Sequence, residues 1–396
     1  MRHLLSILLY LVLASASYAQ DALLLWKFST GSGIYSSPVI SGNRIYFGSS
    51  DMYLYAVDKA SGKLIWKFET KGAVNSSPAI HQNNVIFSSA DGIIYSVDKN
   101  TGKLVWKFKT KGEQRYDLWD YYLSSATISD NVAYIGSGNS TIYALRADSG
   151  KMLWSYKTNG VVHATPVLKD NTVFVGSYDG NFYALNSQSG KLIWKFKTVG
   201  DAYFPKGEIQ RAALVHNNTI IFGSRDYNIY AIDAKTGTGK WNMKERGSWI
   251  IATPLLYNNN IYFGTSDTHR FYCMSAESGE LKWTLPLNMR VYGTASRIDN
   301  EIVFGCFNGK VYSVDAASGK NRAIFQTEES KKRYSTLYTS DDEFRKDFEL
   351  YGKDYVANEK QILSLGSILS DPLVENQTLY FGDTNGFFYA LKVNKD

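Results

Sequence analysis

The chain has little of several residue types, and each scarcity excludes a class of protein. Only two of its 396 residues are cysteines, Cys273 and Cys306, so a small fold held together by a disulfide framework is excluded. These two could pair with each other or be buried as two small side chains. The formal net charge is only +6 and the lysines are spread along the chain. The basic stripe that nucleic-acid binding requires is therefore absent.

The apolar run near the start is too short to cross a bilayer, which takes about 20 residues. This run extends from Leu4 to Ala14, after a basic start and before the small residues Ser17 and Ala19. Such a pattern is typical of a secretory signal peptide cleaved before Gln20. We therefore predict a signal peptide over residues 1–19 and one exported, soluble domain over 20–396. Since no cysteine follows the cleavage site, no lipid anchor is expected.

What the chain does have is a repeat of about 40 residues. The phrase SGKLIWKF at 61–68 returns as TGKLVWKF at 101–108 and as SGKLIWKF at 189–196. Seven tryptophans mark the repeat, 40, 40, 48, 40, 47 and 42 residues apart. They are Trp26, Trp66, Trp106, Trp154, Trp194, Trp241 and Trp283. Self-similarity at this period indicates a repeat architecture, and eight units can be aligned.

Each unit contains four short segments with the alternation and the aromatic and β-branched residues of strands. Asp-Gly and Asn-Gly pairs, such as Asp91-Gly92 and Asn308-Gly309, separate the second segment from the third, as in tight hairpins. Four-stranded antiparallel units of this length predict an all-β fold, an eight-bladed β-propeller. The last unit lacks its fourth strand, and a spare one, LLLWKF, stands at 23–28. We expect the N-terminal strand to complete the eighth blade.

The tryptophan of each unit is predicted to be structural. It follows a small residue and the Ser/Thr-Gly-Lys turn at a fixed offset, as in YAVDKASGKLIW at 55–66. This pattern suggests that the indole lies over the backbone of a neighbouring blade and holds the two blades together. In the seventh unit position 323 is alanine, so that joint is expected to be the weakest.

The pattern Ala-x-Asp-x-x-Thr/Ser-Gly-Lys-x-x-Trp resembles the tryptophan-docking repeat of the PQQ-type (pyrroloquinoline quinone) eight-bladed propellers, over nearly the whole mature chain. Two branches of that family share it: quinoprotein alcohol dehydrogenases, and non-catalytic propellers similar to the outer-membrane assembly factor BamB. The dehydrogenase branch implies bound PQQ, a calcium site and adjacent cysteines. Cys273 and Cys306 are 33 positions apart, and no motif marks the calcium ligands.

Function is sought where the repeats differ, because loops on a rigid scaffold carry function. Three connections between units are long, at 109–123, 197–210 and 326–369, and all are expected on one face. The third carries Ser340 and Glu343 at capping-box spacing, which predicts one short helix over the following FRKDFELY. Aromatic and arginine side chains are typical of interface hot spots. The candidates are Arg115, Tyr116, Trp119, Tyr121, Tyr203, Phe204, Lys206, Arg211 and Trp249.

One residue before each inner strand is expected near the mouth of the central channel. These residues are Tyr35, Asn75, Leu123, His163, Gln210, Ile251, Tyr292 and Leu369. His163 and Tyr292 join the candidates for the binding face. One histidine without a second histidine or a close carboxylate pair does not make a zinc site, so no metal site is predicted.

The sequence thus favours a soluble, exported propeller, periplasmic or secreted, that binds a protein partner or ligand through the face with the insertions. It is expected to be non-catalytic and without a cofactor, and its partner to be an exported or outer-membrane protein. Two alternatives stay open: a PQQ-dependent dehydrogenase with calcium, and a secreted propeller that binds or processes carbohydrate.

Overall fold

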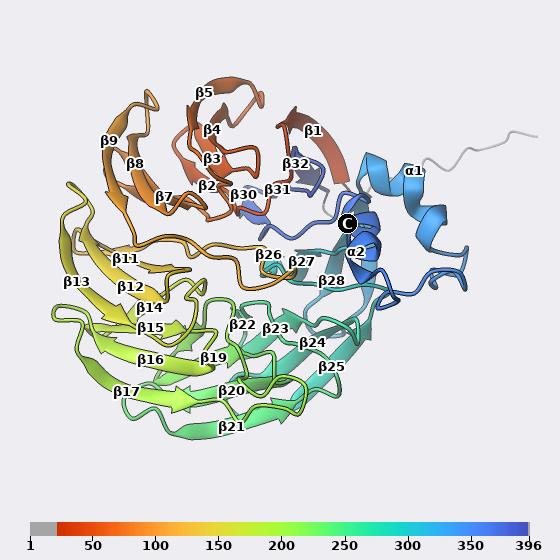
Figure 1. The fold of residues 1–396 in the computed structure, drawn as a ribbon. Coiled ribbons are helices and arrows are strands. Elements are labelled where there is room, and N and C mark those ends of the chain that lie inside the picture. The colour runs from red at the N-terminus through yellow and green to blue at the C-terminus, as the bar shows by residue number, and fades with distance from the viewer. Residues whose placement is uncertain (1–21, 395–396) are drawn as a thin grey trace, which may run out of the picture.

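Eight four-stranded antiparallel sheets form a ring in the computed structural model, which describes residues 22–394 (Figure 1). The predicted eight-bladed propeller is confirmed. The predicted signal peptide, residues 1–19, lies outside the described residues.

Each blade runs from the central channel outward, and blades 1 to 4 follow the chain order. Blade 1 contains β2 (Val39–Ser41), β3 (Arg44–Gly48), β4 (Tyr53–Asp58) and β5 (Leu64–Glu69). Blade 2 contains β6 (Ala79–His81), β7 (Asn84–Ser89), β8 (Ile93–Asp98) and β9 (Leu104–Lys109). Blade 3 contains β10 (Thr127–Ser129), β11 (Val132–Ser137), β12 (Thr141–Arg146) and β13 (Met152–Lys157). Blade 4 contains β14 (Val167–Lys169), β15 (Thr172–Gly176), β16 (Asn181–Asn186) and β17 (Leu192–Lys197).

Blades 5 to 7 repeat this arrangement, and blade 8 draws on both ends of the chain. Blade 5 contains β18 (Leu214–His216), β19 (Thr219–Gly223), β20 (Asn228–Asp233) and β21 (Gly239–Lys244). Blade 6 contains β22 (Leu255–Tyr257), β23 (Asn260–Gly264), β24 (Arg270–Ser275) and β25 (Leu281–Pro286). Blade 7 contains β26 (Ser296–Ile298), β27 (Glu301–Gly305), β28 (Lys310–Asp315) and β29 (Asn321–Gln326). Blade 8 contains β30 (Leu373–Glu375), β31 (Thr378–Gly382), β32 (Phe387–Val393) and, outermost, β1 (Ala22–Ser29).

The strand β1 closes the ring, as the sequence predicted. It pairs antiparallel with β32, with Trp26 opposite Ala390. The same pairing of an indole with a small residue recurs inside the other blades, for example Trp66 opposite Ala56. Because the start and the end of the chain share one sheet, no gap is left between the first and last blades.

The repeated phrase has a geometric basis in contacts between blades. The Trp26 indole of blade 8 lies against Gly62 in the third turn of blade 1, and its Nε1 donates to the Lys59 carbonyl at 3.1 Å. A Cβ at Gly62 would lie 2.5 Å from the ring, and φ is +70°. Both constraints demand glycine. The other six indoles lie against equivalent glycines: Gly102, Gly150, Gly190, Gly237, Gly279 and Gly319.

Blade 7 has no such indole, and the closure of the ring explains why. In blade 8 the third strand, β32, and the fourth strand, β1, come from opposite ends of the chain. No Ser/Thr-Gly-Lys turn joins them, so an indole at position 323 would have no glycine to pack on. Ala323 is exposed there.

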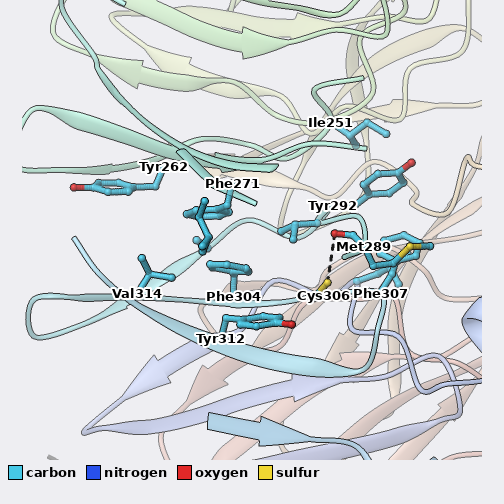
Figure 2. Close-up of a cluster of buried hydrophobic side chains, with 14 of the residues drawn as sticks. Ile251, Tyr262, Phe271, Met289, Tyr292, Phe304, Cys306, Phe307, Tyr312 and Val314 are labelled. Carbon is cyan, nitrogen blue, oxygen red and sulfur yellow. Dashed lines mark hydrogen bonds between the residues drawn. The ribbon is translucent and has the colours of Figure 1, made fainter. Parts of the chain in front are cut away.

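The largest hydrophobic cluster lies between blades 6 and 7 and extends to the channel mouth. It stacks Phe271 on Phe304, with ring centroids 4.0 Å apart, and includes Tyr292 and Phe307 (Figure 2). Cys306 is buried in it, and its Sγ donates to the Met289 carbonyl at 3.6 Å. Cys273 and Cys306 are both buried and unpaired. The structure thus favours the second of the two alternatives for them, burial as two small side chains.

The third insertion contains two helices, and the predicted helix over FRKDFELY is wrong. Thr327 caps the N-terminus of helix α1 (Glu328–Leu337), and Asp354 caps that of α2 (Tyr355–Leu363). Between them Asp342 has φ of 60°, which interrupts a helix, and Phe344 folds back to stack on Tyr338 at 5.0 Å. Aromatic packing outweighs the local capping signal there. Neither helix is long and apolar enough to cross a membrane, and no other helix occurs within residues 22–394.

Candidate functional site

Two positions of each repeat face the mouth of the channel, and the side chains at these positions differ in size from blade to blade. The first lies in the hairpin between the second and third strands, and the second lies three residues before the position of the inner loop that is small in most repeats. Over blades 3 to 7 most of them are large: Tyr121, Tyr178, Glu208, Arg225, Trp249, Arg290 and Phe307. Over blades 1 and 2 they are small: Ser50, Ala73 and Ala90. The mouth is therefore filled on one side and hollow on the other.

A buried ion pair joins the third insertion to blade 7. Glu359 of α2 accepts from Arg290 Nη1 at 2.8 Å and from the Tyr121 hydroxyl at 2.5 Å. The exposed fraction of the Glu359 side chain is 3% and that of Arg290 is 1%. Because Tyr121 belongs to the first insertion, this pair also joins the first insertion to the third. Such pairs hold geometry well, since loss of one partner leaves a buried charge uncompensated.

A second ion pair, between buried Arg225 and partly buried Asp117, joins the first insertion to blade 5. Arg225 donates to both carboxylate oxygens of Asp117, with 3.2 Å between Nη2 and Oδ1, and its Nε donates to Gln210 at 3.1 Å. The guanidinium lies over the Trp249 ring, 4.3 Å from its centroid. The second insertion joins the same group, because the Tyr116 hydroxyl donates to Glu208 at 2.8 Å. All three insertions are thus tied to one another and to the ring.

His163 is enclosed by the first insertion. Its Nδ1 lies 2.9 Å from Asp120 Oδ2, and its Nε2 lies 2.7 Å from Glu113 Oε1. Burial alone would lower the pKa of His163, but the two carboxylates outweigh burial and raise this pKa to about 10. Burial would raise the pKa of Asp120, yet His163 and hydrogen bonds, including one from Tyr178, hold it below its usual value. His163 is therefore an imidazolium that pins the first insertion.

A further ion pair joins two blades that are not neighbours in the ring. Arg211 of blade 5 reaches Asp371 of blade 8, with 2.5 Å between Nη2 and Oδ1. Its guanidinium also lies 4.1 Å from the centroid of the Tyr122 ring. Arg211 occupies a repeat position that holds serine, alanine or glycine in the other blades. This single large residue narrows the channel below the mouth.

The predicted binding-face residues divide into a buried, a partly buried and an exposed group. Tyr121, His163, Trp249 and Tyr292 are buried, with exposed fractions of 1–6%. They support the face from below. Tyr116, Trp119, Phe204 and Arg211 are partly buried, whereas Arg115, Tyr203 and Lys206 are exposed. The exposed fraction of Tyr203 is 81%, the highest of the group.

Aromatic rings from all three insertions form a row across the face. Tyr355 of α2 stacks on Trp119 at 5.8 Å, and Trp119 meets Trp249 edge-on at 5.6 Å. Phe204 of the second insertion then packs edge-on against Trp249 at 4.9 Å. Trp249 is buried and the end of the row, Tyr355, is 44% exposed. The row gives the face a rigid apolar ridge with an accessible end.

Sequence reasoning missed the charged residues that hold the insertions in place: Asp117, Arg225, Arg290 and Glu359. A signal was present for two of them. Arg225 and Arg290 are the only basic residues at their two repeat positions. A basic residue where the other blades carry none is the signal that marks them. Nothing in the local sequence marks Glu359, since its partners lie 69 and 238 positions away.

The dehydrogenase pattern differs from the residues found here. Cys273 and Cys306 belong to different blades and are unpaired. Within residues 22–394, no three His, Cys, Asp or Glu side chains are grouped so that they could hold a metal ion. The two carboxylates beside His163 contact different nitrogens of its ring, Nδ1 and Nε2. They therefore do not point at a common position.

The sequence matches the family described as "Outer membrane protein assembly factor BamB" over residues 16–118, 122–244 and 197–339. No curated protein sequence matches the chain. Among solved structures, BamB from Moraxella catarrhalis has a TM-score of 0.71 at 16% identity, covering 94% of this chain and 99% of that one. The computationally designed Ika8 protein has a TM-score of 0.70 at 16% identity and covers 95% and 100%. A europium-containing methanol dehydrogenase has a TM-score of 0.69 at 12% identity and covers 94% and 93%.

Proposed function

The chain belongs to the family of the outer membrane protein assembly factor BamB, and we propose that it is a non-catalytic scaffold that binds a protein partner through its insertion face. The insertion face is the surface formed by residues 109–123, 197–210 and 326–369. A fold shared with a dehydrogenase does not decide function, so the proposal rests on the residues of this face.

One observation carries the proposal: three insertions far apart in sequence are locked into one rigid surface that keeps large side chains exposed. The pairs Arg290–Glu359 and Arg225–Asp117 fix the surface from below. Above them Tyr203, Tyr351 and Tyr355 are 81%, 54% and 44% exposed. Rigid aromatic side chains lose little conformational entropy on binding, which is why they dominate protein interfaces.

We further propose that the protein works in the periplasm after removal of residues 1–19. The family description places its members at the assembly of outer membrane proteins, and the apolar run at Leu4 to Ala14 has the length of a signal-peptide core. Its partner would be another exported or outer-membrane protein.

Site-specific photo-crosslinking tests this role. A photoreactive amino acid is placed at Tyr203 or Tyr355 on the insertion face, and at Lys103 or Lys191 in the turns after the third strands as controls. All four side chains are exposed. The proposal expects a discrete crosslinked protein from the first pair and none from the second. Equal crosslinking at all four positions, or none at Tyr203 and Tyr355, contradicts it.

The dehydrogenase alternative needs a separate test, because the fold is similar to that of a methanol dehydrogenase. Calorimetric titration of the purified protein with PQQ, with and without calcium, measures it directly. The scaffold proposal expects no stoichiometric binding under either condition. Tight one-to-one binding that requires calcium contradicts the scaffold proposal and supports the dehydrogenase.

A further inference from the structure

A pocket of about 540 Å³ opens on the hollow side of the channel mouth. It lies where the repeat positions are small, over Ser50, Ala73 and Ala90, and α2 and the first insertion form its other walls. Its size falls within the range of about 300–1,000 Å³ that is typical of ligand pockets. Tyr121 contributes to its lining and stacks almost parallel on Tyr35, with centroids 5.5 Å apart and planes 6° apart.

The carboxylates on the pocket wall are already occupied. Glu113 accepts hydrogen bonds from Ser137 and from the Gly138 amide, as well as contacting His163. Asp120 is held by His163, Tyr178 and the Tyr116 amide. Glu359 is held by Arg290, Tyr121 and Trp119. These three groups therefore offer little to a ligand.

The unspent hydrogen-bonding groups on the wall are donors. Within residues 22–394, the exposed ammonium of Lys360 has no hydrogen bond or carboxylate partner. Arg115 uses Nε and Nη2 on the carbonyls of Asp120 and Leu118, which leaves its charge without a carboxylate among the described residues. Burial raises the pKa of Tyr35 to about 12, so its hydroxyl remains a neutral donor.

The wall therefore combines two uncompensated cations with an apolar lining that includes Leu118, Val356 and Leu363. Its lining contains three cationic side chains (Arg115, His163 and Lys360) and three carboxylates that other groups of the protein already hold. These groups complement a ligand that carries a negatively charged hydrogen-bond acceptor next to apolar groups. The same edge of the pocket borders the exposed Tyr355 and Trp119 stack, because Val356 and Leu118 are their neighbours in sequence.

We propose that this pocket anchors the protein partner by taking the carboxylate of an Asp or Glu side chain that is flanked by large apolar residues. The inference rests on the proposed scaffold function and names the chemistry of its partner. The carboxylate lies between Lys360 and Arg115, and the flanking apolar side chains cover the tyrosine pair and the Val356 edge. The partner's neighbouring surface then covers Tyr355 and Trp119.

Two blocked peptides test the inference: acetyl-Leu-Glu-Leu-Gly-amide and its glutamine counterpart, titrated against the full chain by NMR. The glutamate peptide is expected to bind more tightly by roughly three-fold, the effect of one exposed ion pair. Lys360→Gln is expected to abolish that difference and leave the affinity for the glutamine peptide unchanged. Lys353→Gln, another exposed lysine of the same insertion that does not line the pocket, is the matched control.

Charge exchange makes the test independent of folding defects. Lys360→Glu is expected to reverse the preference, so that a peptide with lysine in place of glutamate binds more tightly than the glutamate peptide. Equal binding of both original peptides, no binding of either, or the same effect from Lys353→Gln overturns the inference. Crosslinks at Tyr203 and Tyr355 without peptide binding would overturn only the pocket. Lys360-dependent peptide binding without crosslinks would overturn only the scaffold role.

Discussion

At the scale of single residues, the insertion face is held by charged side chains that are far more buried than their type would suggest. His163 carries a charge inside the protein because two carboxylates face its two ring nitrogens. Arg290 and Arg225 are buried for the same reason, each against a carboxylate of an insertion. Sequence alone placed His163 near the channel mouth, but its partners could not be predicted, because Glu113 and Asp120 reach it only through the fold of the loop.

The charge of His163 makes its contribution to stability depend on pH. Its pKa is about 6.5 when unfolded and about 10 when folded. The stabilisation is thus full below pH 6.5 and is lost as pH rises towards 10. The pKa of Asp120 is lowered, so its own contribution is present above about pH 4 and lost as pH falls further. We expect His163→Gln to lower the free energy of unfolding most near pH 5–6, and the difference from wild type to shrink between pH 6.5 and 10. Denaturant unfolding across pH measures this, and a difference that grows with pH contradicts it.

The seven tryptophans of the repeat are predicted to determine stability rather than binding. Trp66 is 9% exposed and packs on Gly102 of the next blade. Trp66→Ala should cost about 3–5 kcal/mol of unfolding free energy because it leaves a large cavity between two blades. Tyr203→Ala, at a side chain that is 81% exposed, should change it by less than about 0.5 kcal/mol. Denaturant titration compares the two, and similar losses would contradict this division of roles.

Trp249 belongs with the supporting residues. It is 6% exposed and lies between Arg225 and Phe204. Trp249→Ala is therefore expected to destabilise the protein as well as to weaken binding, whereas Trp119→Ala removes a ring nearer the surface. Thermal melting of the two variants separates them, and equal melting temperatures would contradict this ranking.

At the scale of elements, the strands of the repeat were predicted well from the sequence, whereas the helices of the third insertion were not. Eight units with the same alternation and turns allowed their strands to be placed from sequence, because local pattern and fold agree. The insertion at 326–369 has no repeat to support it. Its capping signal at Ser340 is overridden by the packing of Phe344 on Tyr338, while Thr327 and Asp354 supply the caps that are used.

The helix α2 is expected to depend on one carboxylate. Glu359→Gln removes the closer of the two carboxylates beside buried Arg290, the other being Asp267 at 3.4 Å from its Nε. Breaking a buried pair typically costs about 3–5 kcal/mol. We expect faster amide hydrogen exchange in α2 and in the first insertion, with the blades far from blade 7 unchanged. Glu349→Gln, at an exposed residue without an ion pair among residues 22–394, is the control. Unchanged hydrogen exchange in α2 would show that the Arg290–Glu359 pair does not hold this helix in place.

The exposed alanine at 323 offers a test of why the repeat is broken in blade 7. Ala323→Trp restores the repeated phrase but not the receiving turn, which blade 8 lacks because its outer strand is β1. The variant should gain less than about 0.5 kcal/mol in stability. A gain as large as the loss from Trp66→Ala would mean that the new indole packs against another surface. Closure of the ring by β1 would then not explain the alanine at position 323.

At the scale of the whole molecule, closure by β1 and the eight-bladed ring were predictable because each followed from repetition. The surface that distinguishes this propeller was predictable only as a location. Its exposed side chains, such as Tyr203, belong to insertions that the sequence revealed. The contacts of Glu359 with Arg290 and Tyr121, however, join residues up to 238 positions apart. Contacts of that separation leave no local trace in one sequence.

The measurement that tests the central claim most directly is the affinity of the crosslinked partner for wild type and for the double variant Tyr203→Ala, Tyr355→Ala, with thermal melting of both. The account predicts at least a ten-fold weaker Kd, since exposed aromatic anchors typically contribute more than about 1 kcal/mol each, and an unchanged melting temperature. An unchanged Kd, or a loss of binding that accompanies an equal loss of stability, would contradict the claim that the insertion face is a preformed binding surface.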